Sequence, residues 1–191
     1  MVEAKFRISP PEQKNLEDKF FAMLFLPKFQ EALTACAEKT RETGLETGFD
    51  VVSYPQKPFW IEDVRVGGVD GMGMSKVFKE IDGETKEGYK YSEYFHFHFH
   101  PGSKDLAIPS PADLKAFRDK EIQPQYIGIG SVDDDGEITI FVVKKPQYRL
   151  IGYDLQYYEE KVDGVGNYGE LQELLQTISL TGFVVEVKTT S

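Results

Sequence analysis

A run of alternating phenylalanine and histidine constrains the fold of this chain more than any other feature. Residues 93–100 read Glu-Tyr-Phe-His-Phe-His-Phe-His and contain all three histidines of the sequence. Side chains two residues apart on a β-strand point to the same face, about 7 Å apart. The alternation therefore predicts a strand whose phenylalanines face the core and whose histidines, His96, His98 and His100, line the opposite face.

The residues after this strand favour a metal site on the histidine face. Pro101-Gly102 ends the strand, and Ser110-Pro111-Ala112-Asp113 then has the signature of a helix start, with a serine N-cap and a proline at the first helical position. Two imidazoles and one carboxylate, with a fourth position left for water, are a ligand set typical of catalytic zinc. The sequence thus predicts a Zn²⁺ site. The alternative is that Ser110 and Asp113 only cap their helix.

Length and charge limit the class of protein. A chain of 191 residues is long enough for one well-buried domain and short for two. Its net charge of −10, with no run of lysines or arginines, argues against nucleic acid as a partner. The longest apolar run, residues 20–27, is too short to span a bilayer, and the N-terminus lacks the apolar core of a signal peptide. We therefore expect a soluble, cytoplasmic protein that does not bind membranes, with its single cysteine, Cys36, buried as a small hydrophobe.

Hydrophobic periodicity predicts helices interleaved with strands and hairpins. Helices are expected over 12–25, 28–41, 110–120 and 168–178. Strands are expected over 45–54, 59–61, 64–66, 93–100, 126–132, 137–144, 149–158 and 182–188. This order of elements predicts an α/β (α+β) fold, in which helices flank a mixed β-sheet.

Two polar segments are interpreted as turns rather than binding loops. The four glycines of residues 67–73 are not followed by the Gly-Lys-Ser/Thr ending of a phosphate loop. The acidic run at 133–135 lacks the alternating ligands and closing glutamate of a calcium loop, so a solvated turn is expected.

In this order the motifs resemble the JAB/MPN/Mov34 (JAMM) metalloenzyme family, especially its prokaryotic members. That family has a glutamate after its first main helix, a strand with His-x-His-Pro, and Ser-x-x-Asp at the start of a helix. His98-Phe99-His100-Pro101 and Ser110-Pro111-Ala112-Asp113 match the last two, and residues 42–48, Glu-Thr-Gly-Leu-Glu-Thr-Gly, resemble the glutamate segment. The resemblance covers residues 28–145.

The resemblance implies a fold and a division of the chain. The fold would be the cytidine deaminase-like architecture of JAB/MPN proteins, as a single domain over residues 1–191. Residues 1–27 would be an N-terminal extension, and residues 146–191 a C-terminal strand–helix–strand addition.

Carried over residue by residue, the resemblance also implies roles in a site. His98, His100 and Asp113 would bind Zn²⁺. Glu42 would be the general base, with Glu46 as the alternative, and Ser110 would donate a hydrogen bond to the oxyanion. The twelve residues between His100 and Asp113 are two more than the family usually has, which makes Asp105 a competing carboxylate. His96 has no role in the family, and hydrogen bonding in support of the ligands is expected for it.

The implied activity is that of a hydrolase, a zinc metalloprotease of the isopeptidase (deubiquitinase-like) class. Its substrate would be the tail of a ubiquitin-like or sulfur-carrier-like protein, or a peptide. Residues 67–73 and 75–88 lie where relatives carry substrate-clamping insertions, which implies that they hold an extended peptide by strand addition.

Three other classes are weighed against this one. The first is a non-catalytic interaction scaffold of the same fold. The second is a cupin-like barrel, which needs a further metal-binding histidine that the sequence lacks after His100. The third is a relative of the RadC-type proteins, whose DNA contexts do not suit so acidic a chain.

Overall fold

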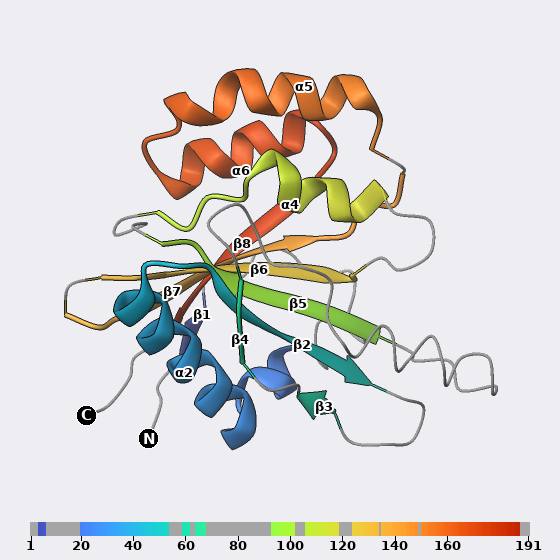
Figure 1. Cartoon of the computed structure of the whole chain (residues 1–191). Helices are drawn as coiled ribbons and strands as arrows, with labels where there is room; N and C mark the ends of the chain where they lie inside the picture. Colours follow the sequence, from blue (N-terminus) through green and yellow to red (C-terminus); the bar gives the residue numbers. More distant parts are fainter. Residues whose placement is uncertain are drawn as a thin grey trace.

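One mixed β-sheet runs through the molecule (Figure 1). The computed structural model describes residues 4–6, 20–53, 59–61, 64–67, 93–101, 106–118, 124–133, 135–148 and 150–187. Within them the strands are β1 (Ala4–Phe6), β2 (Thr47–Ser53), β3 (Trp60–Ile61), β4 (Arg65–Val66), β5 (Glu93–Phe99), β6 (Tyr126–Val132), β7 (Ile138–Lys144) and β8 (Thr181–Val187). They lie in the order β1-β8-β7-β6-β5-β2-β3, with β4 also beside β2. The pair β5 and β6 is parallel and the other pairs are antiparallel.

Helices cover both faces of this sheet. They are α2 (Pro27–Thr43), α4 (Pro111–Lys115), α5 (Gly152–Lys161) and α6 (Tyr168–Thr177), with 3₁₀ turns η1 (Ala116–Arg118) and η2 (Val162–Gly164). In Figure 1, α2 lies on one side of the sheet, and α4, α5 and α6 lie together on the other. The expected α/β class and the mixed sheet flanked by helices are confirmed. No helix in the described segments is long and apolar enough to cross a membrane.

Strand β5 occupies the middle of the sheet, between β2 and β6. Its phenylalanines are buried on the α2 side, where the Phe97 ring lies 5.0 Å from that of Phe29 and 5.4 Å from that of Phe49. Because alternate side chains of a strand point to opposite faces, the three histidines face the side of α4, α5 and α6. The predicted division of this strand is confirmed.

Glycines on β6 make room for the phenylalanines of β5. Phe97 pairs with Gly128 and Phe99 with Gly130 across the parallel strands, and each ring lies over its glycine partner. A β-carbon at either glycine would overlap that ring. The large side chains of β5 can therefore pack flat against the neighbouring strand.

Replacing Gly128 with alanine is expected to lower the free energy of unfolding by about 1–3 kcal/mol, because the added methyl group overpacks the core against Phe97. The matched control is Gly152→Ala, since a β-carbon at Gly152 meets no atom within 4 Å. Urea denaturation followed by circular dichroism measures both. Equal midpoints for the two variants would contradict the overpacking argument.

The expected strand over residues 149–158 is wrong, because α5 begins at Gly152. The apolar residues Ile151, Tyr153 and Leu155 alternate as in a strand, yet Ile151 and Tyr153 are exposed. The buried residues are Leu155 and Tyr158, which lie one helical turn apart. In addition, the backbone N–H of Ile151 donates to the carboxylate of Asp154 at 2.8 Å, which satisfies the helix start. The C-terminal addition is thus helix–helix–strand.

The described residues near the N-terminus, 4–6 and 20–26, are part of the same sheet and core. Strand β1 pairs with β8 at the sheet edge. Residues 20–24 are helical, and Phe20 and Met23 are buried in the cluster that contains Phe97. Pro27 stands in the first turn of α2, where a helix tolerates proline. Within the expected N-terminal extension, residues 1–27, the described residues therefore add a strand to the sheet and side chains to the core.

The single cysteine and the helix that carries Asp113 also match or modify the expectations from the sequence. Cys36 is buried, as predicted, and burial raises the pKa of its thiol to about 12, so it stays protonated at neutral pH. The helix expected over residues 110–120 is the shorter α4, continued by η1. Residues 12–19, 68–92 and 102–105 lie outside the described residues, and with them much of the first expected helix, most of the expected clamping segments and Asp105.

Candidate metal centre

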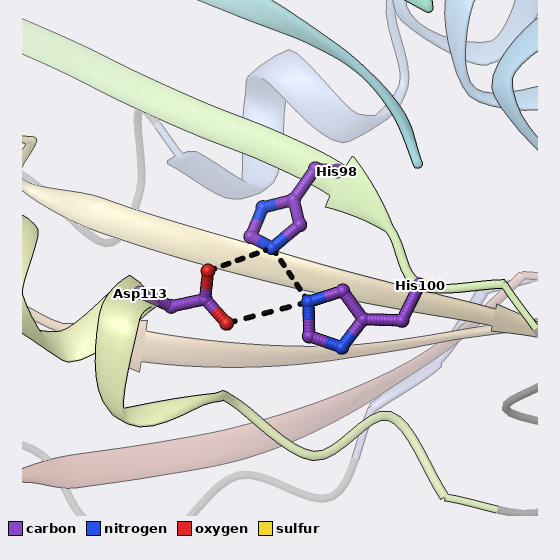
Figure 2. A group of neighbouring side chains, drawn as sticks. All are labelled: His98, His100 and Asp113. Carbon is purple, nitrogen blue, oxygen red and sulfur yellow. Dashed lines mark hydrogen bonds and ion pairs between the residues drawn. The ribbon is translucent and has the colours of Figure 1, made fainter. Parts of the chain in front are cut away.

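Three side chains converge beside the end of β5 (Figure 2). His98 Nε2 lies 3.0 Å from His100 Nε2 and 3.0 Å from Asp113 Oδ1. His100 Nε2 lies 3.4 Å from Asp113 Oδ2. Within the described part of the chain, no other group of histidine, cysteine or carboxylate side chains is arranged to hold a metal ion. The structure thus brings together the three ligands predicted from the sequence.

The spacing of these atoms suits a tetrahedral metal ion. Ligands about 2.1 Å from zinc at tetrahedral angles stand roughly 3.4 Å from one another. The two ring nitrogens are 3.0 Å apart, and they lie 3.0 and 3.4 Å from the two different oxygens of Asp113, so a small cation fits between the three side chains. Two neutral imidazoles would otherwise bring ring nitrogens with lone pairs against each other, so a proton or a cation must lie between them. The donor set is therefore compatible with Zn²⁺, although its geometry does not select one metal.

The local sequence places each ligand. His98 is in β5, and His100 follows its last residue. Asp113 lies in the first turn of α4, where the backbone N–H of Ser110 donates to Asp113 Oδ2 at 2.6 Å. The backbone N–H of Asp113 in turn donates to Ser110 Oγ at 3.2 Å. Capping the helix and facing the histidines are therefore not alternatives for Asp113, since one carboxylate does both.

Burial and charge set the protonation states at this centre. Burial has the largest effect on His98 and lowers its pKa despite the opposing charge and hydrogen bond of Asp113, so this imidazole is held neutral, the form that binds metals. Burial also disfavours the charged form of His100, but the hydrogen bond and charge of Asp113, with the charge of Glu46, outweigh it and raise the His100 pKa. Burial opposes ionisation of Asp113 too, yet the two imidazoles hold the pKa of this carboxyl well below its usual range. The site therefore presents an anionic oxygen ligand.

Of the two candidate bases, the structure brings Glu46 to the centre and not Glu42. Glu46 Oε1 lies 3.9 Å from His100 Nε2. Glu42 is exposed in the last turn of α2, and its side chain makes no hydrogen bond or ion pair within the described residues. The tripeptide Glu-Thr-Gly occurs twice, at 42–44 and at 46–48, so the motif alone cannot choose between the two glutamates.

The next residue, Thr47, fixes the backbone beside Glu46. Its hydroxyl donates to the carbonyl of Cys36 at 2.8 Å and lies 2.6 Å from the hydroxyl of Thr40, so the start of β2 is tied to α2. Thr47 also pairs with Phe99 of β5, which brings the residue before it level with His100. Strand register thus delivers Glu46 to the centre.

The third histidine bonds to a carboxylate that the sequence analysis missed. His96 Nδ1 lies 2.7 Å from Asp50 Oδ1, and Arg65 of β4 forms an ion pair with the other oxygen of Asp50. Asp50 is buried, and the positive charge of Arg65 makes this cluster unsuited to a cation. His96 is expected to hydrogen-bond in support of the metal ligands, but its hydrogen bond goes to Asp50 of β2. Its contact with a ligand is between rings, since its ring centroid lies 5.0 Å from that of His98.

A signal for Asp50 was present in the sequence. Every second residue from 46 to 50 is an acid or a glycine, namely Glu46, Gly48 and Asp50, which is the same two-residue spacing as that of the three histidines. In the antiparallel pair, Gly48 lies opposite His98 and Asp50 opposite His96. An acid, a glycine and an acid therefore face three histidines across two strands.

No protein-family model matches this chain, and no curated protein matches its sequence. The fold and the site define a mixed α/β protein with a buried His–His–Asp group that could hold a metal ion.

Proposed function

We propose that this protein is a zinc-dependent metallopeptidase of the JAB/MPN type. It would hydrolyse an amide bond at the tail of a ubiquitin-like or sulfur-carrier-like protein, or in a peptide. The observation that carries this proposal is the convergence of His98, His100 and Asp113 with a further carboxylate, that of Glu46, 3.9 Å from His100. A metal site with three protein ligands and a nearby carboxylate that does not belong to the set is typical of hydrolytic centres. The choice of substrate rests on the motif resemblance.

His98, His100 and Asp113 would hold the ion, which would supply a Lewis acid that polarises the scissile carbonyl and lowers the pKa of water. The neutral state of His98 and the anionic state of Asp113 match that task, since metal ligands must be deprotonated.

Glu46 is the general base in this proposal. Its carboxylate is half-buried and is held next to His100 by the start of β2. From there it can take a proton from the attacking water and return it to the leaving nitrogen as the carbon–nitrogen bond breaks. The same atom thus accepts and delivers one proton, so no other acid is required.

Ser110 is the oxyanion donor in this proposal. Its Oγ accepts a hydrogen bond from the backbone N–H of Asp113, which leaves its own O–H free to donate. Among the described residues, this hydroxyl donates no hydrogen bond. A donor held in place beforehand stabilises negative charge as it develops on the carbonyl oxygen.

Hydrolysis that depends on zinc is the direct test. The protein, loaded with zinc, is expected to release a ubiquitin-like protein from an amide-linked fluorescent reporter, and dialysis against a chelator should abolish that release. Re-addition of zinc should restore it, because the ligands remain folded around the site. Cleavage that persists after chelation would contradict the proposal. Zinc binding without cleavage of any isopeptide-linked or peptide-linked reporter would favour the non-catalytic scaffold.

A further inference from the structure

Two tyrosines of the C-terminal helices hold the segment that leads to Asp113. The hydroxyl of Tyr158, in α5, donates to the backbone carbonyl of Pro109 at 2.6 Å. The backbone N–H of Ala107 donates to the hydroxyl of Tyr168, in α6, at 2.9 Å. Both hydrogen bonds therefore end on residues 106–110, the stretch that immediately precedes α4.

These tyrosines are fixed by their own surroundings. Tyr158 is fully buried in the cluster formed by α4, α5 and α6 with the sheet. The ring of Tyr168 stacks on Phe141 of β7 with centroids 5.5 Å apart and planes within 4° of parallel. Burial and then the negative charge of Asp113 raise the pKa of Tyr158, so its hydroxyl remains a hydrogen-bond donor. The two hydroxyls are thus rigid attachment points on the sheet and its helical cover.

Helix α4 needs such attachment because it is only five residues long. A helix of one turn or so has little stability of its own. Its buried residue is Leu114, and Phe117 of η1 is buried beside it, both in the cluster with α5 and α6. Pro109 precedes Asp113 by four residues, so the position of its carbonyl bears directly on where the carboxylate lies.

We propose that Tyr158 and Tyr168 are positioning residues that act from the C-terminal helices through residues 106–110 to hold Asp113 at ligand distance from His98 and His100. The inference rests on the metal centre of the proposed function and not on the hydrolysis. The loss of a group that orients a metal ligand typically weakens metal binding by about 10- to 100-fold. Helices α5 and α6 would then be part of the metal centre, and any change that shifts α5 would change its affinity.

The experiment compares Tyr158→Phe, Tyr168→Phe and the double variant with wild type. Each change removes one hydroxyl and keeps the ring, so the packing of the cluster is preserved. Zinc affinity is measured by competition with a chromophoric chelator, and the visible spectrum of bound Co²⁺ reports the geometry of the ligands. Tyr158→Phe is expected to weaken zinc binding about tenfold and to alter the Co²⁺ spectrum, with a larger loss in the double variant.

The matched control is Tyr153→Phe, because Tyr153 lies in the same helix and is 71% exposed. It should leave affinity and spectrum unchanged. A lower melting temperature in Tyr158→Phe with wild-type affinity and spectrum would overturn the inference, since it would show packing alone. If the wild-type protein binds neither zinc nor Co²⁺, the proposed metal centre itself is wrong. The wild-type titration, which is measured first, separates this outcome from a failure of the inference about the tyrosines.

Discussion

Zinc content is expected to fall from about one equivalent per chain to none when His98 and His100 are both replaced by alanine. These residues supply two of the three candidate ligand atoms, which lie within 4.8 Å of one another. With both imidazoles gone, Asp113 alone would remain, and one carboxylate does not retain zinc against dilution and dialysis. Elemental analysis after gel filtration measures the metal, and circular dichroism verifies that the variant is folded.

The third histidine of the strand provides the control. His96 shares the face and the strand of the ligands, but its ring nitrogen is bonded to Asp50. The His96→Gln variant should therefore keep its zinc. If zinc content depended only on the number of histidines, this variant would also lose zinc. Zinc retained by the double alanine variant at the wild-type level would exclude the proposed centre.

Amide hydrolysis is expected to fall by about 10²–10⁴-fold in Glu46→Gln, with zinc content unchanged. Glutamine has nearly the shape of glutamate but cannot accept the proton of the attacking water. Because Glu46 Oε1 is 3.9 Å from His100 Nε2 and Glu46 is not one of the three converging ligands, the metal should remain bound. The rate constant for release of the amide-linked reporter, measured at equal zinc loading, tests this.

Glu42→Gln is the matched control, four residues earlier on the exposed end of α2. It should hydrolyse the reporter at close to the wild-type rate. The opposite result, an inactive Glu42→Gln and an active Glu46→Gln, would restore the assignment that the motif resemblance first implies. Comparable losses in both variants would point to a change in the loop between α2 and β2 instead of a single base.

Short-range patterns were enough to predict the strand with the histidines and the helix start that carries Asp113. Alternation of Phe95, Phe97 and Phe99 with histidine determines which face is buried, because a strand repeats every two residues. The capping box at Ser110 likewise depends on residues three apart. The family architecture and the activity remain predictions.

The helix α5 shows where such patterns fail. Tyr153 and Leu155 alternate with polar residues, and either a strand or a helix can be drawn through them. The choice between strand and helix depends on which side chains are buried in the cluster that α4 and α6 form with the sheet. The buried side chains are Leu155 and Tyr158. That choice depends on contacts with residues far away in the chain.

By itself, the sequence determined the fold class, the strand with its two faces, and the three side chains that meet as candidate metal ligands. The tertiary structure alone decided that Glu46 and not Glu42 stands at the centre, and that Asp50 binds His96. Both depend on the register of β2 against β5, which joins segments about 50 residues apart. A shift of one residue in that register would turn every side chain of β2 to the other face, and only the packing of both faces prevents it.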